Sequence, residues 1–341
     1  MHGKKNAIAR VAASVGLTRL AEAAANRPHL LVLNYHRVGE AFDTPYDPGN
    51  FSCTCEDFDW QLQYSKSHYD ILTLPEALRV VSGHTILARP SMLFTFDDGY
   101  IDNYQNAFPL LKRHGVPASF FLPTAFIGSS ILPWWDEIAF ILKNSPKQEI
   151  TLTYPQQASF NLSAATLRHT ISAILELYKR PSMRDAERFL VEMEAACGCL
   201  RPQSPQPLQE RSFINWDEAR EMQASGMSFG SHTHSHRILG KLPLDQQIEE
   251  LRLSRQIIER ELGTTIDTLA YPVGHRGSFS PETITAATQT GYRYAFSFYS
   301  GVNRIGSMNP LNILRTGVHS EPKPRFRLRT ALQLLAGYSP I

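Results

Sequence analysis

Short apolar runs alternate with helical segments along this chain, and this alternation restricts the fold more than any other feature. Each apolar run is short enough to be a buried strand, and the segments between the runs have helical spacing or helix-start signals. The predicted strands are residues 30–35, 91–96, 116–122, 227–230, 269–271 and 294–298, and the predicted helices are residues 58–69, 103–113, 216–225, 244–262 and a segment that begins at 281. This order predicts parallel βαβ units, and 341 residues are enough for one large α/β barrel that carries an insertion.

Residues 131–212 interrupt the alternation. The segment is predicted to contain a hairpin and two helices, at residues 150–154 with 158–162, at 164–180 and at 184–196. We interpret it as a mixed α/β insertion over one face of a barrel domain that spans residues 29–320.

Composition excludes two classes of protein. The net charge is only +2, which gives no general affinity for nucleic acid. Apolar runs such as Leu30–Leu33 are far shorter than the ~20 residues that span a bilayer. Lys4, Lys5 and the alanines after them resemble a signal peptide, but Arg10 and Arg19 interrupt the apolar stretch that such a peptide needs. We therefore expect a cytoplasmic protein.

The four cysteines form two Cys-x-Cys pairs, Cys53 with Cys55 and Cys197 with Cys199. Four thiolates could hold zinc, but the usual spacing is Cys-x-x-Cys and these two pairs are far apart in the sequence. Reduced thiols without a metal are the favoured interpretation.

Two adjacent carboxylates, Asp97 and Asp98, follow a predicted strand directly and precede Gly99. Active sites of parallel α/β proteins lie at the carboxyl ends of strands. Two neighbouring carboxylates repel each other, so a positive group is expected beside them. The alternative is a loop pair that only caps the next helix.

Three histidines fall within the five residues from His232 to His236, again after a predicted strand. On a helical turn, His232 and His236 would share a face and could bind one ion, while His234 would point elsewhere. One carboxylate with two imidazoles leaves open positions on a metal, where a bound water has a pKa of ~7 in favourable zinc sites. The second carboxylate could then act as a base, which is a hydrolytic arrangement.

The segments Thr95-Phe96-Asp97-Asp98-Gly99 and His232-Thr233-His234-Ser235-His236 resemble motifs one and two of the polysaccharide deacetylases with a NodB-homology domain, carbohydrate esterase family 4. The resemblance covers residues 30–125 and 213–320. It implies a distorted, TIM-barrel-like (β/α) barrel and removal of acetyl groups from amino sugars. It also implies that Asp97 is the general base and that Asp98, His232 and His236 bind a divalent metal, with zinc preferred over nickel, cobalt or manganese. A metal-bound water would attack the acetamide carbonyl.

Motif three agrees in part. Many members have Arg-x-Pro-aromatic-Gly, whereas this chain has Ala270-Tyr271-Pro272-Val273-Gly274, which is similar to the form found in the exopolysaccharide branch. The resemblance places Tyr271, Pro272 and Val273 at the substrate, with the Val273 N–H as oxyanion donor. The missing arginine normally holds the catalytic aspartate, so Arg276 or Arg315 is expected to substitute for it.

The general acid of the family is a histidine in a late Leu-x-His motif, of which no clean copy exists here. His319 is the nearest match, a few residues out of place, and a surface histidine is the alternative. His36 is a second candidate for the acid, or a structural residue below the site. Tyr100, Trp134 and Trp135 could stack on sugar rings, although core packing explains a Trp-Trp pair equally well.

Both ends of the chain are basic. Residues 1–28 are predicted to form a basic amphipathic helix whose only acid is Glu22, and residues 321–341 a basic helix or tail. One hypothesis is that these ends rest against an anionic membrane surface, at the inner membrane face. Solvated helices packed on the barrel are the favoured interpretation.

The function predicted from the sequence is N-deacetylation of an acetylated glycan in the synthesis of a surface polysaccharide or glycolipid. Hydrolysis of O-acetyl esters or other small amides by the same barrel is one alternative. A glycan-binding protein without catalysis is another, against which the complete set of Asp97, Asp98, His232 and His236 argues.

Overall fold

A parallel sheet forms the centre of the molecule in a computed structural model, which describes residues 2–41, 44–202 and 211–336. Its strands are β1 (His29–Tyr35), β5 (Ser91–Asp97), β6 (Ala118–Leu122), β9 (Ser228–Ser231), β10 (Thr268–Ala270) and β11 (Tyr294–Phe296). Neighbours pair in the order β1-β5-β6-β9-β10-β11, always in parallel. The residues of β5 and β6 are buried on both faces, which explains their continuous apolar sequences.

An irregular last strand closes this sheet into the predicted distorted barrel. Ile313 forms a parallel bridge to Phe296 of β11. Three residues later, β13 (Thr316–Gly317) pairs in parallel with β1. The segment between these two pairings therefore lies between the first and last strands, and it brings Arg315 into the barrel, where the side chain is 1% exposed.

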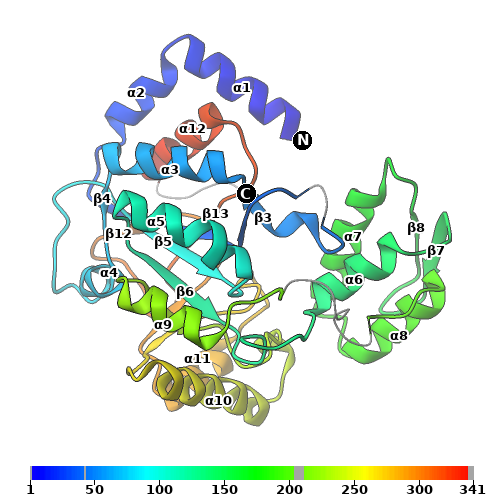
Figure 1. Cartoon of the computed structure of the whole chain (residues 1–341). Coiled ribbons are helices and arrows are strands. Elements are labelled where there is room, and N and C mark those ends of the chain that lie inside the picture. Colours follow the sequence, from blue (N-terminus) through cyan, green and yellow to red (C-terminus); the bar gives the residue numbers. More distant parts are fainter. Residues whose placement is uncertain (1, 42–43, 203–210, 337–341) are drawn as a thin grey trace.

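Helices surround the barrel, as Figure 1 shows. They are α3 (Cys55–His68), α4 (Leu74–Val81), α5 (Phe108–His114), α9 (Trp216–Ala224), α10 (Leu244–Leu262) and α11 (Pro281–Gln289). Capping boxes at Thr73, Asn215 and Ser280 begin three of them. The helix predicted from residue 103 instead starts with a π-helical turn, Asn103–Ala107, in which the Asn103 amide donates to the carbonyl of His36 at 2.6 Å.

Short strands complete the barrel region. They are β2 (Arg37–Val38), β3 (Phe51–Cys53), β4 (Asp70–Ile71) and β12 (Asn303–Arg304). β2 pairs with β3 outside the main sheet, and β4 and β12 extend the sheet beside β5 and β1.

The insertion has a hydrophobic cluster of its own and stands to one side of the barrel (Figure 1). It contains α6 (Trp134–Lys143), β7 (Glu149–Leu152), β8 (Ala158–Asn161), α7 (Leu167–Lys179) and α8 (Ala186–Cys197). The two predicted strands pair as an antiparallel hairpin, while α6 was not predicted. Cys53 and Cys197 are buried in different clusters, so the two cysteine pairs do not form a common metal site.

The chain ends form a layer of three helices: α1 (His2–Ser14), α2 (Leu17–Ala24) and α12 (Lys323–Ala336). The single N-terminal helix predicted from the sequence is wrong, because Gly16 adopts a left-handed conformation with φ of 79° and divides it. Glu22 forms an ion pair with Arg327 at 2.7 Å, which ties α2 to α12. Among the residues that the structure describes, no helix has the length and apolar character to cross a bilayer.

Candidate functional site

A cleft of about 460 Å³ opens at the carboxyl ends of the barrel strands, between the barrel and the insertion. The predicted site residues that line it are His36, Asp97, Asp98, Trp134, Trp135, His232, His236, Val273 and His319. Chain segments as distant as residues 36 and 319 therefore meet in one place. The cleft is the candidate active site.

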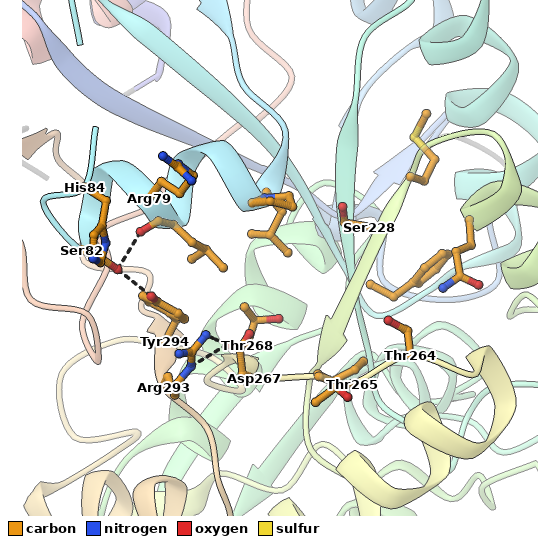
Figure 2. A pocket seen from close by; sticks show the side chains of 17 residues that line it. Arg79, Ser82, His84, Ser228, Thr264, Thr265, Asp267, Thr268, Arg293 and Tyr294 are labelled. Carbon is orange, nitrogen blue, oxygen red and sulfur yellow. Dashed lines mark hydrogen bonds and ion pairs between the residues drawn. The ribbon is translucent and has the colours of Figure 1, made fainter. Parts of the chain in front are cut away.

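A slightly larger cavity, of about 520 Å³, lies at the opposite end of the barrel (Figure 2). Ser228, Thr268 and Tyr294, the first residues of β9, β10 and β11, line it. Its polar groups bond to one another: Arg293 pairs with Asp267, and Ser82 shares a hydrogen bond with Tyr294, as the dashed lines in Figure 2 show. The amino-terminal end of such a barrel usually serves stability, so cavity size alone does not locate the active site.

Asp98, His232 and His236 converge in the cleft. The Nε2 atoms of His236 and His232 lie 3.4 and 3.7 Å from Oδ1 of Asp98. One potential ligand atom from each residue lies within 4.8 Å of the others, and all three side chains are buried. This confirms the predicted proximity of the three residues, and no other metal-binding cluster occurs in the described part of the chain.

The chemistry of these side chains fits a divalent cation. Nδ1 of His232 lies 2.7 Å from the carbonyl oxygen of Ala270, to which a proton on Nδ1 can be donated. Nε2 is then unprotonated, and its lone pair is free to bind a metal beside Asp98. Oδ1 of Asp98 is buried and has no hydrogen-bond partner among the described residues. A buried carboxylate oxygen without a partner is costly, and a metal ion would satisfy it.

The pKa shifts of these three side chains also fit metal binding. Burial, followed by the charges of Asp97 and Asp136, raises the pKa of Asp98 well above its ordinary value. Burial lowers the pKa of both His232 and His236, so both imidazoles are neutral at neutral pH. Neutral imidazoles are the form that binds metals, and a cation would favour ionised Asp98.

The sequence predicted a helical turn for the histidine motif, and this prediction is wrong. Residues 232–236 form an irregular loop after β9, in which Thr233 and His236 have φ of 67° and 55°. The Glu250 carboxylate on α10 accepts hydrogen bonds from the backbone N–H groups of residues 234 and 235, at 3.0 and 2.8 Å. The two imidazoles therefore meet because this anchored loop folds back, and Glu250 had no signal in the sequence.

Asp97 is held by a buried arginine. Arg315 donates to Oδ1 and Oδ2 of Asp97 at 2.7 and 2.8 Å, and Asn34 donates to Oδ2 at 3.0 Å. Burial alone would raise the pKa of Asp97, but the Arg315 guanidinium, with His232, holds this pKa well below its ordinary range. Arg315 thus takes the place of the motif-three arginine, whereas Arg276, the other candidate, is exposed.

Unusual backbone conformations concentrate around the cleft. Among the described residues, five non-glycine residues have positive φ: Asp98, Thr233, His236, Val273 and Ser300. Four of them line the cleft, and Thr233 lies between the two histidines. Such conformations cost of order 1–3 kcal/mol each and cluster at functional sites. At Val273, φ of 64° turns the chain so that its N–H donates to no acceptor in the described part of the protein.

Both candidates for the general acid lie in the cleft. His36 is half-buried, and burial, with the Arg315 charge nearby, lowers its pKa to about 4 although Asp97 opposes this shift. His36 is therefore neutral at neutral pH. His319 is exposed and lies close enough for its charge to affect His36.

Three predicted substrate contacts are wrong. Tyr100 is fully buried, and its hydroxyl bonds to Asp136 at 2.9 Å and Trp135 at 2.6 Å. Tyr271 is 1% exposed and donates to the carbonyl of Leu311, and Pro272 is buried as well. None of the three lines the cleft, so they support its walls rather than contact a ligand.

The tryptophan pair has both of the roles that the sequence left open. Trp135 belongs to the core of the insertion and makes a T-shaped contact with the His236 ring, with ring centroids 4.5 Å apart. Trp134 is half-buried and stacks on the ring of Tyr178, with ring centroids 4.1 Å apart. Both line the cleft.

Sequence reasoning missed the wall that α7 supplies. Ser172, Leu175, Glu176 and Lys179 line the cleft opposite the barrel, and Glu176 pairs with Lys179 at 2.9 Å. A helix predicted inside an insertion carries no local sign that its face borders a site formed elsewhere.

The known proteins to which this chain is similar are named as deacetylases. The family model for polysaccharide deacetylases matches residues 86–295. YxkH of Bacillus subtilis strain 168, a polysaccharide deacetylase by name, is 23% identical over 225 residues, which are 66% of this chain and 50% of YxkH. The poly-beta-1,6-N-acetyl-D-glucosamine N-deacetylase of Staphylococcus epidermidis is 36% identical over 110 residues, 29% of this chain and 38% of that protein. The chain thus spans about half the length of one curated relative and less of the other.

Solved structures share the fold. IcaB from Ammonifex degensii has a TM-score of 0.58 at 20% identity, with 91% of this chain and 98% of that chain covered. The deacetylase PplD of Streptococcus pyogenes, in complex with acetate, has a TM-score of 0.56 at 18% identity, with coverage of 92% and 99%. At these identities the likeness extends to the fold alone, and it agrees with the distorted barrel described above.

Proposed function

Because the chain belongs to the polysaccharide deacetylase family, we propose that its cleft removes acetyl groups from N-acetylated amino sugars of a surface polysaccharide or glycolipid precursor. One observation carries the proposal: Asp98, His232 and His236 meet around one point, beside an Asp97 that is ionised by its pairing with Arg315. Three ligands with an open position, next to a separate carboxylate, are suited to activating a water molecule.

The residues of the cleft have distinct parts in this proposal. Asp98, His232 and His236 would hold a divalent metal, which when bound acidifies a water molecule and polarises the acetyl carbonyl. Asp97 accepts the proton of the attacking water, and Arg315 with Asn34 fixes the orientation of its carboxylate. The Val273 N–H, which has no acceptor among the described residues, would donate to the developing oxyanion, and His319 would protonate the departing amine.

The metal requirement gives the first prediction. Removal of bound metal with a chelator should abolish acetate release from N-acetylglucosamine oligomers, and adding back zinc, cobalt, nickel or manganese one at a time should restore it. The metal should also raise the midpoint of thermal unfolding, because it binds the folded site only. Full activity of the metal-free protein would contradict the proposal, and acetate release from O-acetylated sugars alone would identify an esterase instead.

The general acid gives the second prediction. His319→Gln should lower kcat by about 10²-fold or more and flatten the alkaline limb of the pH profile, because protonation of the leaving amine is lost. His36→Gln should leave that limb in place, because His36, with a pKa of about 4, carries no proton to donate at neutral pH. If His36→Gln removes the limb and His319→Gln does not, the two assignments are reversed.

A further inference from the structure

The outward side of the two N-terminal helices carries large apolar side chains that no other described part of the chain covers. Ile8, Val11, Val15, Leu17 and Leu20 are 54–67% exposed. Across the described residues, eleven large hydrophobic side chains are exposed, and these five fall within thirteen consecutive positions. We call them the apolar stripe. Scattered exposed leucines are ordinary on a protein surface, but a cluster of this kind marks an interaction surface.

The stripe is not needed to attach these helices to the molecule. The small residues Ala9, Ala12, Thr18 and Ala25 are the ones buried in this region, each 8% exposed or less. Contacts to α12 such as the Arg327–Glu22 ion pair complete the attachment. A surface helix usually buries its large apolar residues and exposes the small or polar ones, so this orientation is reversed.

Exposed basic residues are interspersed with the stripe residues in the sequence and flank them. Lys4, Lys5, Arg10, Arg19 and Arg27 are all exposed. The one acid in residues 4–27, Glu22, is half-buried and occupied by Arg327 and the Tyr64 hydroxyl, at 2.7 and 2.8 Å. The outward surface of α1 and α2 is therefore apolar and positive, without an accessible carboxylate.

We propose that α1 and α2 dock on the surface of a membrane that contains anionic lipids. The apolar stripe enters the boundary between headgroups and acyl chains, and the lysines and arginines contact lipid phosphates. A second copy of the chain fits this surface poorly, because it would bring five further cations against the first five with no acid between them. The proposal is independent of the reaction in the cleft.

Vesicle co-sedimentation of the full chain tests this. The protein should pellet with vesicles of phosphatidylcholine and phosphatidylglycerol at low salt, and much less with phosphatidylcholine alone or at high salt. Replacing three stripe residues together, Ile8→Gln, Val11→Gln and Leu20→Gln, should lower partition into the mixed vesicles by about tenfold or more. Lys4→Gln, Arg10→Gln and Arg19→Gln together should lower it by a similar factor, because each basic residue near the surface adds to the attraction.

Matched controls come from the same chain. Ile86→Gln, Val191→Gln and Leu200→Gln replace exposed apolar residues elsewhere, and Lys112→Gln, Lys147→Gln and Arg184→Gln replace exposed basic ones. Both control variants should bind vesicles as the unchanged protein does. Point substitutions are preferable to deletion of α1 and α2, which would uncover the face of α12 beneath them. Equal partition of the stripe variant and the unchanged protein would overturn the proposal. So would a stripe-dependent dimer that does not bind vesicles.

Discussion

Replacing Asp97 by asparagine should lower the kcat for acetate release by about 10³-fold, because the substitution removes the carboxylate that accepts the proton of the attacking water. The change is nearly isosteric, and the new amide oxygen can still accept a hydrogen bond from Arg315. The metal content should stay at its original level, since the three proposed ligands are Asp98, His232 and His236. Steady-state kinetics together with metal analysis of the purified variant measure both effects.

The neighbouring carboxylate provides the control. Asp98→Asn should lose activity together with bound metal, because Oδ1 of Asp98 is the buried oxygen that faces both imidazoles. The two adjacent substitutions thus separate proton transfer from metal binding. An Asp97→Asn protein that keeps more than about a tenth of the original kcat would exclude Asp97 as the base. Loss of metal from that variant would move Asp97 into the ligand set.

The positions of the site motifs could be predicted because each follows directly on a buried strand. Asp97 ends β5, and His232 follows β9, which pairs with β6 and so lies two strands from β5. Parallel strands present their carboxyl ends at one edge, so two motifs more than a hundred residues apart had to meet there. The pattern of apolar runs indicated where the motifs lie, whereas the separate roles of Asp97 and Asp98 came from the resemblance to a family.

The conformation of the backbone within the motifs could not be predicted. A helical turn was the regular way to bring His232 and His236 together, but the chain uses left-handed conformations at Thr233 and His236 instead. No local preference favours threonine there, and hydrogen bonds from distant residues such as Glu250 stabilise the loop. The sequence likewise showed that Tyr100 and Tyr271 lie beside motifs, but not that their rings face inward.

Of the two partners of Asp97, Asn34 could have been predicted from the sequence and Arg315 could not have been chosen with certainty. Asn34 is the one amide in the apolar run 30–35, and a lone polar residue in a buried strand implies a specific partner. The choice between Arg276 and Arg315 could not be made from the sequence. It depends on the closure of the barrel through residues 313–317, where only two residues are regular enough to count as a strand.

Arg315→Met should reduce the free energy of unfolding by about 3–5 kcal/mol and abolish acetate release, because it leaves the Asp97 carboxylate buried without its cation. Arg315 also donates to the side chain of Asn34 and to the carbonyl of Ser297, so the variant loses the group that connects three segments of the barrel. Arg315→Lys should restore part of the stability but not all of it, since an ammonium keeps the positive charge and lacks the planar fork with which Arg315 bonds both carboxylate oxygens side by side. Urea unfolding in the presence of a chelator measures these differences without a contribution from bound metal. As a control, Arg293→Met removes an ion pair with Asp267 in which the arginine is 71% exposed, so solvent screens the pair and the midpoint of urea unfolding should stay close to that of the unchanged protein.

The pH dependence of this loss follows from the direction of the pKa shift of Asp97. In the unchanged protein this pKa lies below its ordinary value, so the pair stabilises the fold above about pH 4, and the stabilisation disappears as pH falls through the folded-state pKa. In Arg315→Met, burial without the guanidinium raises the pKa of Asp97 above its ordinary value, so the folded variant becomes protonated in mild acid and no longer contains a buried charge. The stability difference between the two proteins should therefore be large at about pH 7 and clearly smaller at about pH 4. A difference that does not change with pH would mean that Arg315 stabilises the barrel by packing rather than by holding the charge of Asp97.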